Sequence, residues 1–248
     1  MLITFVDSLA RPAGSLWQRL QSSSHDDTFN VASPLSSTPF PIYQWILENS
    51  GDFTNWDKTN LVLMDEQVDG DQPPYRYIPL EDPASYEAFA RRSLLDQLSE
   101  KTGVSIDVIK PRLETIDSFN TRIDLLVLAL GIDGNYANVM PGTPESGGWH
   151  IAHLTPAFRQ THTKTGSKSY ENAKFREFGM SLGPQQVLEA KNVVVIISGP
   201  QKHDLATQLL AYREFDPTFP LSIIYHPEVI DRVQIFIAND VGIEGSKS

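Results

Sequence analysis

Hydrophobic residues gather along the chain in short runs rich in Val, Ile and Leu, and longer stretches of mixed polarity separate these runs. Short apolar runs of this kind are typical of strands that are buried on both faces of a sheet. The strands predicted in this way are Phe29–Ala32, Asn60–Met64, Asp124–Leu130, Val193–Ile197 and Val233–Ile237.

The stretches between these runs carry the start signals of helices. Thr38-Pro39 combines a capping hydroxyl with a proline suited to a first turn, and Asp82-Pro83 does the same for a helix that reaches about Leu98. Strands that alternate with helices predict an α/β fold with a doubly wound, mostly parallel sheet and helices on both faces. The other predicted helices are Leu9–Leu20, Pro184–Ala190 and Gln201–Tyr212.

Length and composition favour one folded unit. The chain has 248 residues, of which 40% are hydrophobic, so we expect a single domain over residues 1–248 with a substantial core. The 31 acidic and 20 basic side chains give a net charge of −11, which argues against nucleic acid as a general partner. The longest apolar run, Leu125–Ile132, is too short to span a membrane.

Cysteine is absent, which excludes disulfides, thiolate catalysis, cysteine-ligated zinc and iron–sulfur sites. This fits a reducing compartment, and no secretory signal is visible at the N-terminus, so we expect a cytoplasmic location. The histidines are scattered, with His150, His153 and His162 the nearest to a group, and we expect them in the core or on the surface rather than around a metal.

Two predicted strand-end loops carry candidate chemistry, because ligands bind at the carboxyl ends of strands in open parallel sheets. The first contains the hydroxyls of Ser36, Ser37 and Thr38 and opens a helix, whose N-terminus favours phosphate; an ordinary capped helix is the alternative.

The second of these loops contains adjacent carboxylates, Asp65 and Glu66, which point in different directions. One can face a ligand with a raised pKa, as a general base requires, while the other makes structural bonds. Two solvated acids in a turn are the alternative.

Two further loops follow the next strands. Gly131 and Gly134 flank Asp133 and allow the backbone to approach a ligand closely, although a tight turn explains them as well. Lys202 lies in the predicted first turn of a helix, where its charge opposes the helix dipole unless an anion binds there. A solvated surface lysine is the alternative.

The segment 159–178 differs from the rest of this acidic chain in its charge. It holds five basic side chains against two acidic ones, together with glycine and serine. We interpret it as a candidate lid that closes over an anionic ligand. A solvated loop with a chance excess of positive charge is the alternative.

The order and spacing of the four loops resemble the family of glucosamine-6-phosphate deaminases/isomerases and 6-phosphogluconolactonases. The resemblance extends from about Phe29 to about Asn239. The motifs that carry it are Ser36-Ser37-Thr38-Pro39, Met64-Asp65-Glu66, Asp82-Pro83-Ala84-Ser85-Tyr86, Gly131-Ile132-Asp133-Gly134, Ser198-Gly199-Pro200-Gln201-Lys202 and His226-Pro227. It implies a Rossmann-like fold and action on sugar 6-phosphates.

The resemblance also implies roles for individual residues. Ser36, Ser37 and Thr38 would hold the phosphate, and Lys202 would pair with it. Asp65 would move a proton between C1 and C2 of an open-chain sugar, and Asp133 would lie beside the sugar.

The chain departs from the family pattern in places that affect the chemistry. Ser36 and Ser37 replace two glycines of the phosphate loop. Asn135 stands where both branches of the family carry a histidine, and Met140 stands where the deaminases carry the glutamate that partners it. Asparagine forms hydrogen bonds but takes up no proton near neutral pH.

These departures favour one hypothesis about the function and leave two others open. A lactonase loses its water-activating base, whereas a deaminase or isomerase keeps Asp65 for the central proton transfer. We therefore expect an aldose–ketose isomerase or deaminase that acts on a hexose or hexosamine 6-phosphate. The alternatives are a 6-phosphogluconolactonase-like hydrolase and an inactive sugar-phosphate binder.

The expected partner is a small sugar phosphate. We expect no nucleic acid or membrane as a partner and no metal or organic cofactor. The oligomeric state stays open, and a homo-oligomer is one possibility.

Overall fold

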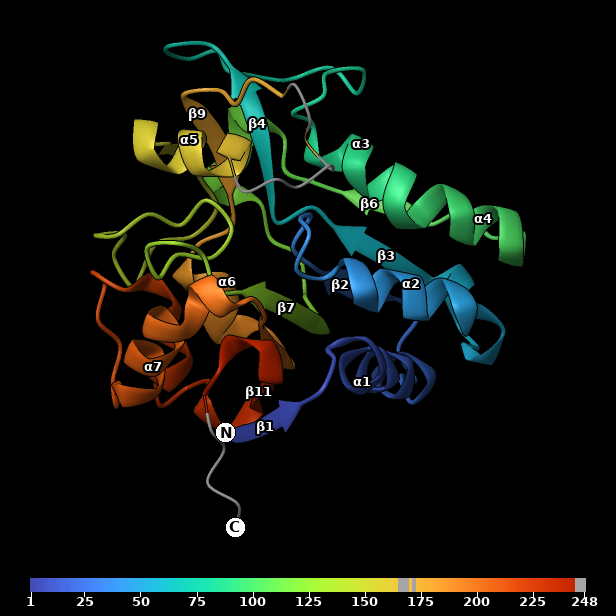
Figure 1. Ribbon diagram of the computed structural model, residues 1–248. Coiled ribbons are helices and arrows are strands. Elements are labelled where there is room, and N and C mark those ends of the chain that lie inside the picture. The colour runs from blue at the N-terminus through green and yellow to red at the C-terminus, as the bar shows by residue number, and fades with distance from the viewer. Residues whose placement is uncertain (165–169, 171–172, 244–248) are drawn as a thin grey trace.

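The computed structural model describes residues 1–164, 170 and 173–243 and has a seven-stranded sheet at its centre (Figure 1). The strand order is β1-β11-β10-β7-β2-β3-β6, and every neighbouring pair is parallel. The strands are β1 (Leu2–Val6), β2 (Phe29–Ala32), β3 (Thr59–Val62), β6 (Asp107–Ile109), β7 (Leu125–Ala129), β10 (Val193–Ile197) and β11 (Val233–Ala238). The predicted α/β fold with a mostly parallel sheet is confirmed.

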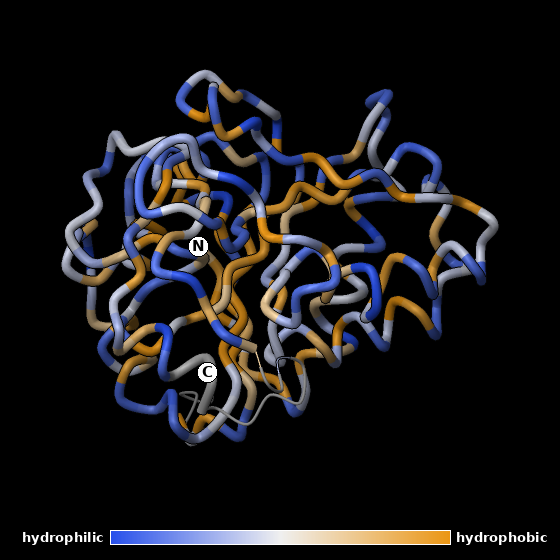
Figure 2. The backbone as a smooth tube through the Cα atoms, turned by 90° about the horizontal axis from the view of Figure 1, so that it is seen from above, coloured by the Kyte–Doolittle hydropathy of each residue, from blue (hydrophilic) through white to orange (hydrophobic). Residues whose placement is uncertain are grey.

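The burial of each strand explains whether the sequence pattern predicts it. Every residue of β2 and β10 is buried, so both faces of the sheet are covered there, and the apolar runs reflect this. The two edge strands, β1 and β6, were not predicted, because each is partly exposed and β6 has only three residues. Figure 2 shows the most hydrophobic stretches running through the middle of the molecule, with hydrophilic segments around them.

A second, antiparallel sheet was also not predicted. It has the order β5-β4-β9-β8, and its strands β4 and β9 lie toward the top of Figure 1. The strands are β4 (Asp65–Asp69), β5 (Arg76–Tyr77), β8 (His150–His153) and β9 (Phe178–Ser181). The prediction that Asp65 and Glu66 lie in a loop after a strand is therefore wrong: after Leu63 and Met64 the chain continues directly into β4. The polar sequence of β4 conceals the strand, because pattern analysis relies on apolar residues.

The described helices are α1 (Ala10–Ser22), α2 (Phe40–Glu48), α3 (Tyr86–Ala90), α4 (Asp96–Thr102), α5 (Pro156–Lys164), α6 (Pro184–Glu189) and α7 (His203–Ala211). Among these described helices, none is both long and apolar enough to cross a bilayer.

Two predicted helix starts are wrong. Thr38 does not cap α2, which begins at Phe40 after Pro39 without a side-chain cap. Asp82 does not start a helix either: its carboxylate accepts a hydrogen bond from the Ala84 N–H at 2.8 Å and forms a turn, and Ser85 caps α3 three residues later. The helical segment then continues through a π-helical turn, Arg91–Leu95, into α4.

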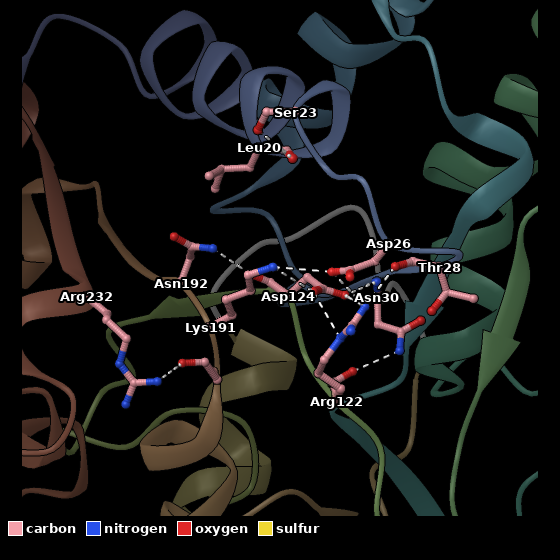
Figure 3. A network of polar contacts seen from close by, with 11 residues as sticks. Leu20, Ser23, Asp26, Thr28, Asn30, Arg122, Asp124, Lys191, Asn192 and Arg232 are labelled. Carbon is pink, nitrogen blue, oxygen red and sulfur yellow. Dashed lines mark hydrogen bonds and ion pairs between the residues drawn. The ribbon is translucent and has the colours of Figure 1, made fainter.

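A charged network at the amino ends of the central strands fixes their register (Figure 3). The buried Asp124 carboxylate precedes β7 and accepts hydrogen bonds from the Asn30 N–H in β2 at 2.9 Å and from Arg122 at 3.2 Å. Arg122 and Lys191 both form ion pairs with Asp26 at 3.3 Å. Because β2 and β7 are held here at their amino ends, the loops that follow them emerge together at the opposite end.

Candidate active site

A pocket of about 160 Å³ opens at the carboxyl ends of the central strands. Its walls come from segments that are distant in the sequence: residues 34–38 after β2, Met64 and Asp65, residues 129–132 and 135–137 after β7, and Gln201 and Lys202 after β10. Tyr86 and Tyr170 complete the walls. This position agrees with the general location of ligand sites in open parallel sheets.

One wall of the pocket is a loop that we call the phosphate loop, residues 33–39, between β2 and α2. The backbone N–H groups of Ser36, Ser37 and Thr38 have no hydrogen-bond acceptor among the described residues. The hydroxyl groups of these three residues have no hydrogen-bond partner among the described residues either. The loop leads directly into α2, and the N-terminus of this helix attracts negative charge. Free N–H groups and hydroxyls at a helix N-terminus suit an anion such as phosphate.

Lys202 brings a positive charge to the same pocket. It ends the short 3-10 helix Pro200–Lys202 and lies directly before α7, close to the predicted position. Its ammonium group has no hydrogen bond or ion pair with any residue that the structure describes. Burial lowers the pKa of Lys202 to about 8, and the Asp133 carboxylate acts in the opposite direction. An anionic ligand would favour the charged form.

Asp65 is the carboxylate of the pocket wall. It is the first residue of β4 and is 9% exposed, and its carboxylate accepts no hydrogen bond from the described residues. Burial, and to a smaller extent the negative charge of Glu66, raise the pKa of Asp65 to about 8. A carboxyl group whose pKa lies near the working pH can both take up and return a proton.

Glu66, the next residue, does not line the pocket. Its buried carboxylate accepts hydrogen bonds from the backbone N–H groups of Gln67, Tyr86 and Glu87 at 2.8–2.9 Å and from the Ser85 hydroxyl at 3.0 Å. Burial raises the pKa of Glu66, and these hydrogen bonds oppose that rise. The bonds hold the first turn of α3, and with it the pocket residue Tyr86.

Comparison with known proteins places the chain in a family. The model of the family described as glucosamine-6-phosphate isomerases/6-phosphogluconolactonase matches residues 7–233. The chain belongs to this family. The predicted resemblance is therefore confirmed.

Two kinds of relative resemble the chain: glucosamine-6-phosphate deaminases and a 6-phosphogluconolactonase. A glucosamine-6-phosphate deaminase of Halalkalibacterium halodurans is 23% identical over 238 residues, which cover 91% of this chain and 90% of the relative. A 6-phosphogluconolactonase of Caulobacter vibrioides is 29% identical over 116 residues, which cover 44% of this chain and 45% of the relative.

Solved structures from both branches share the fold. A monomeric glucosamine-6-phosphate deaminase matches with a TM-score of 0.77 and 18% identity, over 98% of this chain and 99% of that one. The 6-phosphogluconolactonase of Thermotoga maritima matches with a TM-score of 0.65 and 16% identity, over 96% of this chain and 98% of that one.

Asn135 lines the pocket, but its amide group is turned into its own loop. Its Nδ2 donates to the Ala137 carbonyl at 3.2 Å, and its Oδ1 is buried without a hydrogen bond. The Gly131 N–H donates to the Asn135 carbonyl at 2.7 Å, and a Cβ atom at Gly131 would lie 1.7 Å from Asn135 Oδ1. The turn thus needs glycine at 131, and it holds Ala137 at a φ of 44°.

Asp133 does not line the pocket. One of its carboxylate oxygens is buried without a hydrogen bond, and its charge acts on Lys202. Asp133 therefore influences the charge state of a pocket residue from outside the pocket wall.

The predicted lid, 159–178, lies partly outside the described residues, which here include Arg159, Tyr170 and 173–178. Arg176 donates to Asp69 and Asp82, each at 2.6 Å, and does not line the pocket. No group of His, Asp or Glu suited to a metal ion occurs among the residues whose side chains the structure describes.

Sequence analysis missed the tyrosines of the pocket, Tyr86, Tyr136 and Tyr170. Tyr86 belongs to the motif Asp82–Tyr86, which the resemblance includes, but no role was assigned to it. Tyr136 and Tyr170 lie outside the strand-end motifs, so no local pattern points to them.

Proposed function

We propose that the chain is an aldose–ketose isomerase or deaminase that acts on a hexose or hexosamine 6-phosphate. One observation carries the proposal: Asp65, a buried carboxyl group with a pKa of about 8, shares a pocket with the free N–H groups of the phosphate loop. The names of the related deaminases support the same assignment.

In the proposed complex the phosphate group binds the N–H and hydroxyl groups of Ser36, Ser37 and Thr38, and Lys202 pairs with its charge. This fixes the far end of an open-chain sugar, so that the carbonyl end reaches Asp65. Fixing the substrate at its phosphate supplies orientation without any bond to the reacting atoms.

The Asp65 carboxylate then removes the proton from C2 of the aldose. The electron pair of the C2–H bond forms a C1–C2 double bond, and the carbonyl oxygen at C1 takes up a proton from water to become a hydroxyl oxygen. Return of the proton from Asp65 to C1, with loss of the O2 proton to water, gives the ketose. In a hexosamine the same step leaves an imine at C2, which water hydrolyses to release ammonia. A raised pKa suits this cycle, because the protonated Asp65 must also be an effective acid.

The proposal includes a cytoplasmic location and action without metal or organic cofactor. It leaves open whether the working form is a homo-oligomer, which sedimentation of the purified chain measures directly.

Turnover assays on a matched panel test the proposal. The panel contains glucosamine, galactosamine, glucose and fructose 6-phosphates and 6-phosphogluconolactone, each assayed with the wild type and with Asp65→Asn. We expect ketose or ammonia formation that is lost in Asp65→Asn. Lactone hydrolysis that persists in the variant would replace the proposal with a hydrolase, and thermal stabilisation by a sugar phosphate without any turnover would replace it with a binding protein.

A further inference from the structure

We propose that Tyr170 is a positioning residue for the substrate phosphate, because its hydroxyl fixes the peptide that presents the Ser36 N–H group. The inference rests on the proposed function and adds a residue to it that no strand-end motif contains.

The carbonyl groups of two consecutive residues in the phosphate loop are held by tyrosines. Tyr170 donates its hydroxyl proton to the Leu35 carbonyl. The Tyr43 hydroxyl lies 2.7 Å from the Pro34 carbonyl and 2.9 Å from the Ser33 hydroxyl. Its single proton goes to the carbonyl, which can only accept, and the Ser33 hydroxyl then donates to Tyr43.

Peptide geometry connects these bonds to the free N–H groups. In a trans peptide the C=O and N–H bonds point in opposite directions. The Leu35 carbonyl and the Ser36 N–H belong to one peptide, so the bond to Tyr170 directs the Ser36 N–H away from Tyr170. Ser36 lines the pocket, and this N–H has no acceptor among the described residues, so it is left for a ligand.

The Tyr170 ring is itself fixed by aromatic neighbours. Its centroid lies 5.3 Å from that of Phe89, 5.6 Å from that of Tyr86 and 5.6 Å from that of Phe175. Burial raises the pKa of the Tyr170 hydroxyl well above its usual value, so the hydroxyl remains a donor throughout the assay range. Tyr86 and Phe89 belong to α3, whose first turn is bonded to Glu66, so the phosphate loop and Asp65 are tied to the same helix.

Tyr170→Phe removes this hydroxyl and keeps the ring. We expect the KM for the 6-phosphate and the Kd for inorganic phosphate to rise about 5- to 10-fold, which corresponds to one lost hydrogen bond, with kcat nearly unchanged. Turnover of the unphosphorylated parent sugar should not change. Tyr77→Phe is the matched control, because the Tyr77 hydroxyl also donates to a backbone carbonyl, that of Pro111 at 2.8 Å, away from the pocket.

The outcomes separate the inference from the proposed function. If the wild type binds no phosphate ester, the proposed function fails. If it binds and turns over a 6-phosphate but Tyr170→Phe has the same KM and Kd, the inference fails alone. An equal rise in KM for Tyr77→Phe, or an equal loss of turnover with the unphosphorylated sugar, would also overturn the inference.

Phe175→Leu loosens the packing of the Tyr170 ring without removing the hydroxyl. It provides a second test if Tyr170→Phe does not fold, and we expect KM and Kd to rise in it as well.

Discussion

The carboxylates of Asp65 and Glu66, which are neighbours at the start of β4, face different surroundings. Successive side chains of a strand point to opposite faces. Asp65 therefore lines the pocket, whereas Glu66 accepts its hydrogen bonds from α3 and from Gln67. The charge of Glu66 in turn raises the pKa of Asp65, so the structural carboxylate adjusts the carboxylate of the pocket wall.

Asp65→Asn should abolish turnover and raise stability. Loss of a general base lowers the rate by about 100- to 10,000-fold. The pKa of Asp65 is about 8 in the folded chain against its usual 3.8, so the folded state binds more protons than the unfolded state between these values, and stability falls as the pH rises through this range. An asparagine at this position does not titrate, so the variant Asp65→Asn does not lose stability in this way. Urea unfolding at pH 4 and pH 8 should show a gain for Asp65→Asn only at pH 8, and a lower stability than the wild type at pH 8 would contradict the assignment.

Glu66→Gln should move the acid limb of the pH–rate profile toward lower pH. Removing the neighbouring charge lowers the pKa of Asp65, although burial, the larger cause, remains. The amide NH₂ would also meet backbone N–H donors, so we expect a loss of about 1–3 kcal/mol in the free energy of unfolding. Glu87→Gln is the control for the limb, since the Glu87 carboxylate pairs with Arg91 and Lys110. A limb that stays in place in Glu66→Gln would show that the charge of Glu66 does not reach Asp65.

The profile of kcat/KM against pH should be bell-shaped, with a maximum near pH 8. Asp65 must be deprotonated to act as a base, and Lys202 must be protonated to pair with phosphate, and each has a pKa of about 8. Lys202→Arg keeps the positive charge at higher pH and should remove the alkaline limb. Lys191→Arg, at the opposite end of the sheet, should leave the profile unchanged. An alkaline limb that survives in Lys202→Arg would assign it to another group.

Gly131→Ala should disrupt the pocket. The new Cβ would lie 1.7 Å from Asn135 Oδ1 and 2.8 Å from the Asn135 carbonyl oxygen, so the turn must open. We expect a loss of stability of about 1–3 kcal/mol, as for overpacking, together with a loss of turnover. Gly51→Ala is the matched control, because nothing lies within 4 Å of a Cβ at that position. Thermal unfolding that is equally affected in both variants would contradict the role of the turn.

The central strands could be predicted because burial on both faces leaves an apolar run, as in Val193–Ile197. The second sheet could not, because β4 begins with Asp-Glu-Gln and its pairing with β9 joins residues far apart in the sequence. The same limit applies to the pocket. Ser36, Asp65 and Lys202 stand in local motifs, and the structure brings them to one pocket. Tyr170 reaches that pocket through its packing on α3, which no local pattern encodes.

Proton NMR in D₂O tests the proton transfer at Asp65 most directly. Glucosamine, galactosamine and glucose 6-phosphates, each of which carries a proton at C2, are incubated with the wild type or with Asp65→Asn, and the signal of this proton is followed. The account predicts that the wild type exchanges this proton for deuterium in one of the sugars, and that Asp65→Asn does not. C2 signals that persist equally with the wild type, with Asp65→Asn and without enzyme would contradict it.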